Sequence, residues 1–331
     1  MPPEVSVVIP TYNRAHLLGD AAASVLTQTY ANLELIIVDD GSRDATRDVC
    51  MDLASRDQRV HYIYQENKGP NAARNAGVYA AQGRFIAFLD SDDLWEPTKL
   101  AKQLEIADIE ADVALVYCDW AHLTEAGDIR AGVNPPDLGL STVYESLLYG
   151  NTVHGSASAV LIRKECFDRV GLFDETLRYM EDWDMWLRVA QHFQLAKVHC
   201  VLVYIRQHNE QEQRNALGMA SGYLKVIDKI SSSIPTEYQH HLPRVRWHNQ
   251  LLAAELYCAG SATVKCWRTL ALAIKSWPAG LLSPRTWYVL ALSLTGPLYP
   301  QANAVGLTLR KWGRQHLKMN TVTGWNGHSL Q

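Results

Sequence analysis

The sequence predicts an α/β fold, with a Rossmann-like, mainly parallel sheet flanked by helices and a helical C-terminal region. Two observations predict it. Over about the first hundred residues, short runs rich in Val, Ile, Tyr and Phe alternate with segments of helical periodicity, which is the pattern of βα units. Beyond about Asn215 these runs stop, and tryptophans lie among Leu and Ala in helix-compatible segments. We therefore expect an α/β domain at residues 1–214 and a helical region at 215–331.

The first strands and helices can be placed in chain order. Four apolar runs that end near turn signals are expected to be buried strands: Val5–Ile9, Leu33–Val38, Val60–Tyr64 and Phe85–Leu89. The helical patterns between them have about the length of a crossover helix: Leu17–Leu26, Ala45–Ala54 and Ala72–Ala81. In a doubly wound sheet of this kind, ligands bind outside the carboxyl ends of the strands.

The second part of the domain is less regular. After a strand at Val113–Trp120, the Gly- and Pro-rich residues 127–141 are expected to form a mobile loop over the site. Two more strands and a helix complete the domain: Ala157–Ile162, Val198–Ile205 and, between them, Asp182–His192.

The C-terminal region leaves two readings open. Its longest apolar piece, residues 286–299, is too short to span a bilayer and is interrupted by Gly296 and Pro297. Helices packed on the α/β domain are the favoured interpretation. The alternative is a helix lying on a membrane surface, helped by four cations: Arg310, Lys311, Arg314 and Lys318.

Composition bounds the partners and the compartment. A chain of 331 residues with a net charge of -4 has no basic footprint for nucleic acid, so no nucleic-acid partner is expected. The six cysteines show no CxxC pair or zinc-ligand spacing, and we expect reduced, buried thiols. The N-terminus lacks a basic segment followed by a long apolar one, which makes the cytoplasm the default compartment.

The stretch FLDSDDLW places Asp90, Asp92 and Asp93 directly after a buried strand. Crowded carboxylates repel one another unless they are solvated or a cation lies among their oxygens. Two carboxylates separated by one residue can hold a divalent cation while a neighbour binds a hydroxyl. A solvated turn is the alternative, but the position at a strand end favours the cation.

A second acidic pair, Asp39 and Asp40, closes the second strand before the turn at Gly41 and Ser42. A turn with a helix N-cap, either Ser42 or Asp44, explains the residues that follow. It explains two adjacent acids less well. Asp39 could accept a hydrogen bond from a base N–H, and Asp40 could accept one from the ring of a nucleoside or from nearby backbone.

Two further segments carry charge near expected helix starts. In NKGPNAARNAG, Arg74 would suit a diphosphate or a base edge, because a helix N-terminus favours anions; an exposed helix face is the alternative. In YMEDWDMWLR, Glu181 and Asp182 could simply stabilise the helix, because the helix dipole favours negative charge at its N-terminus. Alternatively, Asp182 could be a catalytic base.

Five motifs, PTYNR, VDDGS, GPNAARNAG, FLDSDDLW and MEDWDMWLR, resemble in order and spacing those of family 2 glycosyltransferases. The resemblance covers roughly residues 4–210. It implies a GT-A fold, a nucleotide-sugar donor, a divalent metal, Mn²⁺ or Mg²⁺, and transfer with inversion at the anomeric carbon.

The resemblance also implies roles for single residues. Asp39 would face the base, Asp90 the ribose and Asp92 the metal, with His208 near the metal or diphosphate. Asp182 would be the catalytic base, oriented by Glu181. The remaining donor-binding candidates are Pro10, Thr11, Tyr12, Asn13, Arg14, Asp40, Lys68, Arg74, Ser91, Gly155 and Ser156. Candidates for contact with sugar rings are His154, Trp183 and Trp186, the last being favoured as core.

The expected function is then the transfer of one sugar, from a UDP-sugar by preference, to a glycan or lipid-linked glycan in surface polysaccharide biosynthesis. A protein acceptor and an inactive nucleotide-sugar-binding protein are the alternatives. A dinucleotide-dependent oxidoreductase would need GxGxxG where PTYNR stands, and a nucleotidyltransferase a glycine-rich loop with an Arg. A processive synthase would add QxxRW and membrane-spanning helices, and neither is visible. The expected location is the cytoplasm, including the inner face of the plasma membrane.

Overall fold

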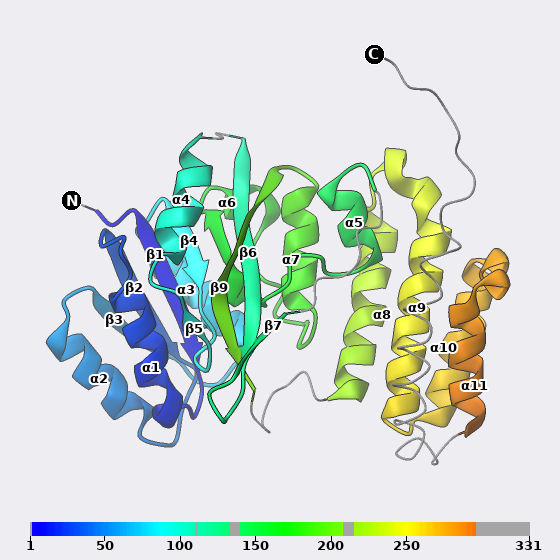
Figure 1. The fold of residues 1–331 in the computed structure, drawn as a ribbon, viewed down its shortest axis with the longest axis horizontal. Coiled ribbons are helices and arrows are strands. Elements are labelled where there is room, and N and C mark those ends of the chain that lie inside the picture. Colours follow the sequence, from blue (N-terminus) through cyan, green and yellow to red (C-terminus); the bar gives the residue numbers. More distant parts are fainter. Residues whose placement is uncertain (1, 110–111, 133–139, 208–214, 296–331) are drawn as a thin grey trace.

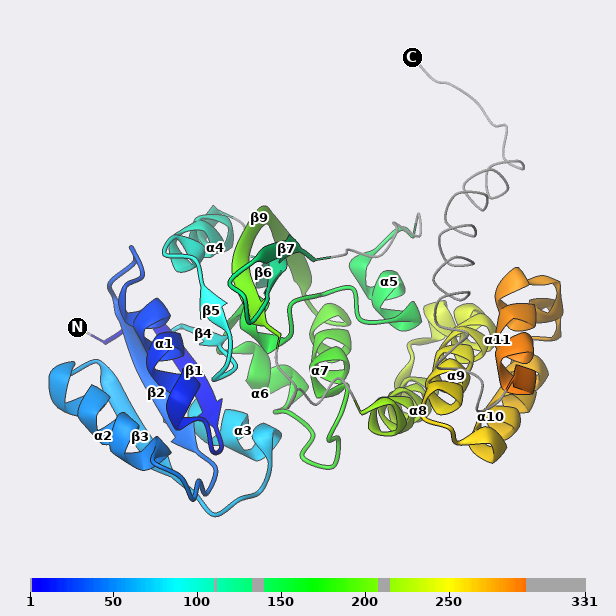
Figure 2. The same cartoon turned by 60° about the horizontal axis from the view of Figure 1, so that its bottom comes forward.

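The computed structural model describes residues 2–109, 112–132, 140–207 and 215–295. A sheet with helices on both faces occupies one end of the molecule, and the helices that follow it in the chain stand side by side at the other end (Figure 1). The view in Figure 2 shows the same separation. The α/β fold class with a helical C-terminal region is confirmed.

The N-terminal half contains the predicted βα units. Its strands and helices are β1 (Val5–Thr11), α1 (Ala15–Leu26), β2 (Leu33–Asp39), α2 (Thr46–Arg56), β3 (Val60–Tyr64), α3 (Pro70–Ala80) and β4 (Phe85–Phe88). Strand β1 pairs in parallel with β2 and β4, and β3 pairs in parallel with β2. Every residue of β1 and β2 is buried, because helices cover both faces of this part of the sheet.

The second half extends the sheet and adds the helices around it. Its elements are β5 (Leu94–Trp95), α4 (Lys99–Ile109), β6 (Val113–Leu123), β7 (Ile129–Ala131), α5 (Val143–Tyr149), the 3₁₀ helix η1 (Ala157–Ala159), β8 (Val160–Arg163), α6 (Cys166–Val170), α7 (Glu181–Ala190) and β9 (Gln194–Arg206). The strand order is β3-β2-β1-β4-β8-β6-β9-β5, with β7 paired to the end of β6.

The sheet is parallel from β3 to β4 and mixed beyond it. Strand β8 runs antiparallel to both β4 and β6, whereas β6 and β9 are parallel. If β8 were parallel to its neighbours, the chain would need a crossover connection before it, usually a helix packed on the sheet. Helix α5, which precedes β8, packs on α7 and α9 instead. The chain therefore enters β8 from the edge at which β4 ends.

The C-terminal region is helical, as predicted. It consists of α8 (Ala216–Ser233), the 3₁₀ helix η3 (Thr236–His241), α9 (Leu242–Ala259), α10 (Thr263–Ser276), the 3₁₀ helix η4 (Pro278–Leu282) and α11 (Pro284–Thr295). Helix α8 joins the sheet core through Val226, Ile227 and Ile230, and α9, α10 and α11 share a core of their own. Within the described residues, no helix has both the length and the apolar character needed to cross a membrane.

Two expectations are corrected. Part of the predicted mobile loop is a hairpin, because Ile129–Ala131 pairs with the end of β6; residues 133–139 lie outside the described residues. The prediction of reduced, buried thiols holds for Cys50, Cys118 and Cys166 but is wrong for the other three.

The exceptions have local causes. Cys200 is exposed because it lies in a bulge: Cys118 and Asp119 of β6 pair with Val198 and Val201, which leaves Cys200 unpaired between them. Cys258 and Cys266 form a disulfide with a Cα–Cα distance of 5.7 Å. The short turn between α9 and α10 brings them together.

Candidate active site

The loops after β1 and β2 form one hydrogen-bonded unit. The N–H of Asn13 donates to Ser42 Oγ at 2.9 Å, and the N–H of Arg43 donates to Asn13 Oδ1 at 2.8 Å. Asn13 has φ 52°, in the left-handed region that Asn tolerates. The structure thus brings the predicted PTYNR and VDDGS segments together, with Tyr12 exposed and the hydroxyl of Thr11 buried without a partner.

The two acids after β2 are used differently. Asp39 is 1% exposed, and its two oxygens accept hydrogen bonds from the Ser42 N–H at 2.8 Å and the Tyr62 hydroxyl at 3.0 Å. Asp40 accepts from Gln65 Nε2 and from the N–H groups of Lys68 and Gly69, at 2.7 to 2.9 Å. Asp40 therefore shapes the loop that leads into α3, from which the exposed Lys68 projects.

Arg74 connects three elements of the site. Its side chain is 7% exposed, and the guanidinium donates to Asp90 Oδ1 and Glu181 Oε1, each at 2.9 Å. It also reaches Asn71 Oδ1 at 3.2 Å and lies over the Phe173 ring. The residue expected to bind an anion thus links the acid at the end of β4 to the acid at the start of α7.

The acidic cluster after β4 is held by serines. Ser156 Oγ donates to Asp90 Oδ2 at 2.9 Å, and Ser158 Oγ donates to Asp93 Oδ2 at 2.7 Å. Burial, together with the charges of Asp92 and Asp90, raises the pKa of Asp93 well above its usual range. The predicted mutual repulsion of these carboxylates is therefore present in the structure. Ser91, between them, is buried.

A divalent cation fits this cluster if a bound substrate supplies further oxygen atoms as metal ligands. Among the described residues, no three His, Cys, Asp or Glu side chains converge as a complete cation site. Asp92 is half-buried. Mg²⁺ and Mn²⁺ prefer oxygen ligands, and a carboxylate at a strand end together with phosphate oxygens of a substrate would supply them. His208, the other predicted ligand, lies outside the described residues.

The first turn of α7 carries the predicted base. Asp182 Oδ1 accepts from the Trp183 N–H at 2.7 Å, and Oδ2 accepts from Asn151 Nδ2 at 3.0 Å. Burial raises the pKa of Asp182, and the charge of Asp90 adds to this shift, although the Trp183 N–H and the charge of Arg74 favour the charged form. Burial also raises the pKa of Glu181 to about 7; Arg74 opposes this shift and the charge of Asp182 adds to it.

The tryptophans of α7 belong to the core. Trp183 and Trp186 are both 0% exposed, and Trp183 Nε1 donates to the carbonyl of Leu147 at 2.7 Å. The suggestion that Trp183 contacts a sugar ring is therefore wrong. Its hydrogen bond instead anchors α5 to α7.

Residues 151–158 run from Asp182 to the acidic cluster. Asn151 contacts Asp182 at one end, while Ser156 and Ser158 contact the cluster at the other. The turn between them needs a glycine at position 155, because φ is 94° there and a Cβ added at this position would lie 2.8 Å from the Cβ of Ala159. Sequence reasoning found Gly155 and Ser156 but missed Asn151 and Ser158, single polar residues without a local signal.

Unpartnered polar atoms gather beside this segment. Thr152 Oγ1 and His154 Nε2 are buried without a hydrogen-bond partner, as are Trp120 Nε1 and His122 Nδ1 at the end of β6. Trp120 lies against Gly155, and its ring centroid is 4.6 Å from that of His122. Buried polar groups without partners are costly. We refer to these four residues as the unpartnered polar wall.

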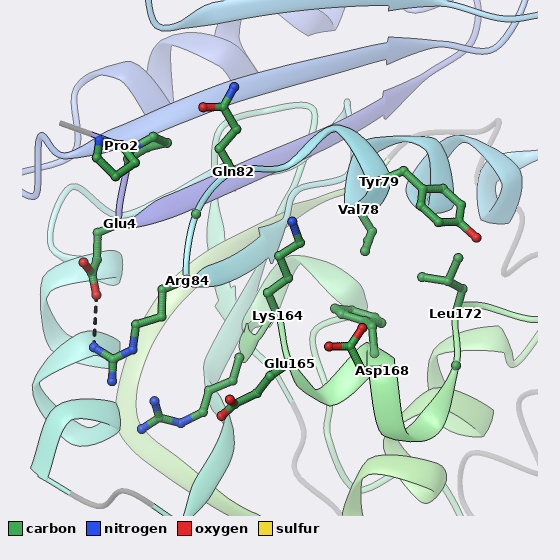
Figure 3. Close-up of a pocket in the computed structure, with 15 residues that line it drawn as sticks. Pro2, Glu4, Val78, Tyr79, Gln82, Arg84, Lys164, Glu165, Asp168 and Leu172 are labelled. Carbon is green, nitrogen blue, oxygen red and sulfur yellow. Dashed lines mark hydrogen bonds and ion pairs between the residues drawn. The ribbon is translucent and has the colours of Figure 1, made fainter.

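A separate groove lies at the opposite edge of the sheet. It has a volume of about 900 Å³ and lies beside the starts of β1 and β4 (Figure 3). An ion pair between Arg84 and Glu4, at 3.2 Å, crosses it, and Lys164 donates to the carbonyl of Ala81. None of the predicted site residues lines this groove.

Comparison with known proteins identifies the family. Residues 6–171 match the model of Glycosyl transferase family 2. The chain belongs to this family. An uncharacterized glycosyltransferase of Rickettsia typhi is 32% identical over 243 residues, which are 69% of this chain and 73% of that protein.

Two further glycosyltransferases have more specific names. The putative teichuronic acid biosynthesis glycosyltransferase TuaG of Bacillus subtilis is 36% identical over 191 residues, 57% of this chain and 73% of TuaG. The UDP-Glc:alpha-D-GlcNAc-diphosphoundecaprenol beta-1,3-glucosyltransferase WfgD of Escherichia coli is 32% identical over 197 residues, 59% of this chain and 73% of WfgD.

Solved glycosyltransferase structures share the fold. S. aureus TarS has a TM-score of 0.59 and 17% identity, covering 88% of this chain and 54% of TarS. The mannosyltransferase PcManGT from Pyrobaculum calidifontis, in complex with GDP-Man and Mn²⁺, has a TM-score of 0.58 and 18% identity, covering 89% of this chain and 87% of that one. The predicted GT-A fold is thereby confirmed. The family match ends at Gly171, before Glu181 and Asp182.

Proposed function

We propose that this glycosyltransferase transfers one sugar, with inversion, from a UDP-sugar to a hydroxyl of a glycan or lipid-linked glycan in surface polysaccharide biosynthesis. One observation carries the proposal. Arg74 binds Asp90, on the donor side, and Glu181, beside the proposed base, at 2.9 Å each. A site for single displacement needs a donor half and a base half in fixed relation, and the two contacts of this guanidinium support such an arrangement.

Asp182 is the proposed general base. It would take the proton from the acceptor hydroxyl while that oxygen attacks the anomeric carbon opposite the leaving diphosphate. One such displacement inverts the anomeric centre. The raised pKa of Asp182 favours proton uptake, and the N–H donors from Trp183 and Asn151 fix the carboxylate's orientation. Glu181, held by Arg74, would orient this turn.

The donor would lie along the ends of β1, β2 and β4. Asp39 would face the base and Asp90 the ribose, in a pocket completed by residues 10–14, Asp40, Lys68 and Ser91. Asp92, with His208, would hold Mn²⁺ or Mg²⁺, which when bound neutralises charge on the departing diphosphate. Gly155 and Ser156 would border the sugar.

The sugar itself is supported by the unpartnered polar wall. Thr152, His154, Trp120 and His122 each have a buried nitrogen or oxygen atom that a sugar hydroxyl could satisfy. Burial lowers the pKa of His122 and of His154, so both rings are neutral near pH 7 and can accept or donate a hydrogen bond.

The choice of donor and acceptor follows the relatives' names. WfgD uses UDP-Glc and a diphosphoundecaprenol-linked sugar, and TarS has been solved with UDP-GlcNAc. We extend this to a catalytic domain at residues 1–214 and an acceptor-side or membrane-side region at residues 215–331. The proposed location is cytoplasmic, at the inner face of the plasma membrane.

A thermal-shift panel tests the donor half. UDP-, GDP- and dTDP-sugars are added with and without Mn²⁺ to the wild type and to Asp92→Ala. A ligand at about 100 times its Kd should add about 2.7 kcal/mol of stability, and we expect this only for the wild type with metal. A shift that survives in Asp92→Ala would refute the metal assignment.

Transfer assays test the base half. Asp182→Asn should bind the donor normally and lose about 100- to 10,000-fold in rate. If the wild type binds donors but glycosylates neither lipid-linked glycans nor proteins, the protein is the inactive binding protein instead. A preference for GDP-Man, which is bound in the PcManGT structure, would show that UDP is the wrong donor nucleotide in this proposal.

A further inference from the structure

The end of the chain has a one-sided charge. All 35 Asp and Glu residues lie at or before Glu255, whereas eight of the 31 Lys and Arg residues follow it. Residues 256–331 thus carry only positive charge in a chain whose net charge is -4. A charge asymmetry of this kind is typical of segments that bind an anionic surface.

The described part of this segment also exposes large apolar side chains. Among the described residues, fifteen large hydrophobic side chains are exposed, and seven of them lie between Thr263 and Thr295. They are Val264, Trp267, Leu272, Leu281, Leu282, Trp287 and Leu294. A concentration of this kind marks an interaction surface, whereas single exposed apolar residues need no explanation.

Helix α11 contributes Trp287 and Leu294, which lie on one apolar stripe. Pro284, Trp287, Ala291 and Leu294 are exposed and recur every three or four residues, which places them on one helix face without a charged residue. Trp287 is 60% and Leu294 75% exposed. The opposite face packs on α9 and α10.

Helix α10 and η4 add cations and a protruding leucine. Lys265, Arg268 and Lys275 are exposed on α10 among its apolar residues, and Leu282 of η4 is 89% exposed. Both views show α10 and α11 at the end of the molecule far from α2, with α9 between them and α8 (Figures 1 and 2). We refer to the outer face of α10, η4 and α11 as the hairpin face.

We propose that the hairpin face docks on an anionic lipid bilayer. Tryptophan and leucine beside Lys and Arg, without any acid, are the composition of helices that lie in a membrane interface. A second copy of this chain fits less well, because two faces of the same positive sign repel each other. This inference rests on the proposed function and names the surface by which the protein would contact the membrane. Binding to vesicles tests that surface independently of catalysis.

Flotation of the full chain with vesicles is the test. Vesicles of phosphatidylcholine alone are compared with vesicles containing about one-third phosphatidylglycerol. We expect binding only to the anionic vesicles and weaker binding at high salt. Leu282→Glu/Trp287→Glu/Leu294→Glu should lower the partition coefficient by about tenfold or more. Lys265→Gln/Arg268→Gln/Lys275→Gln should lower it by about fivefold per cation.

A matched control separates the face from added charge. Met51→Glu/Tyr79→Glu/Ile109→Glu places three acids on exposed apolar positions elsewhere and should bind like the wild type. Equal binding by the Leu282/Trp287/Leu294 variant would overturn the proposal, as would no binding to either vesicle. Loss of binding only in Arg310→Gln/Lys311→Gln/Arg314→Gln/Lys318→Gln would also overturn it. The donor thermal shift, measured on each variant, keeps this result separate from a failure of the proposed glycosyl transfer.

Discussion

Removal of the Asn151 side chain tests whether Asp182 is the base and how it is held. Asn151→Ala deletes the N–H donor that lies 3.0 Å from Asp182 Oδ2 and leaves the Trp183 N–H on the other oxygen. A hydrogen bond to a charged group contributes about 1.5–3 kcal/mol. Because this bond favours the carboxylate form, its loss raises the pKa of Asp182 further above its usual range.

The consequence is an effect that depends on pH. Where Asp182 is partly protonated in the variant, kcat/KM should fall about 10- to 100-fold relative to the wild type, which is the same free energy expressed as a ratio. At higher pH both proteins carry the carboxylate, and only the loss of orientation remains, about tenfold or less. The acid limb of the pH–kcat/KM profile should therefore move to higher pH.

The assay is the full pH–kcat/KM profile of sugar transfer, with Asn151→Ser as a partial rescue, because serine retains a short donor. Asp182→Asn serves as the reference, because asparagine does not titrate and the acid limb of the profile should be absent. A uniform loss of rate at every pH would refute the reasoning, since it would show that Asn151 supports the structure without affecting proton uptake by Asp182. Donor-induced thermal shifts should be unchanged in all three variants.

The other predictions concern stability and the turn at the site. Arg74→Met leaves Asp90 and Glu181 without their common partner and should cost about 3 kcal/mol in urea unfolding; a loss below about 1 kcal/mol would contradict the bridging role. Gly155→Ala, at φ 94°, should cost about 1–2 kcal/mol from the backbone alone and reduce transfer more than Gly150→Ala, where an added Cβ meets nothing within 4 Å. Burial, with Arg285 and Arg244, lowers the pKa of His248 from 6.5 to about 4. The unfolded chain therefore takes up a proton first as the pH falls from 6.5 to 4, and about 2–3 kcal/mol of stability should be lost there. His248→Phe should show a smaller loss in thermal melts over this range, and an equal loss would exclude His248 as its source.

The parallel half of the sheet could be predicted because its strands carry their own signal. Strands buried on both faces read as mainly apolar runs. Strand β4 is entirely apolar, and β1 and β2 are interrupted near their starts only by Ser6 and Glu34, whose side chains hydrogen-bond to each other. The direction of β8 could not be predicted, since it depends on α5 packing on α7 and α9. The pairing of Cys258 with Cys266 depends on the turn between two helices, which spacing alone did not indicate.

The candidate site was predictable where several polar residues follow a strand together. Asp90, Asp92 and Asp93 were found in this way, as were Asp39 and Asp40. The structure adds that Asp40 accepts three hydrogen bonds from the loop between β3 and α3, whose donors lie 25 to 29 positions away in the chain. Asn151 and Ser158 are single residues whose carboxylate partners lie 31 and 65 positions away in the chain, so only the fold reveals them.

The entry of the chain into β8 from the site edge has a consequence for protein engineering and evolution. Residues 140–159 form one excursion that leads into β8, and it carries both Asn151 and Ser156. An exchange of this excursion between relatives therefore alters the fit of the substrate and the hold on Asp182 and Asp90 at once. Specificity and turnover should diverge together in this lineage, and grafts that retain positions 151, 156 and 158 are the ones expected to stay active.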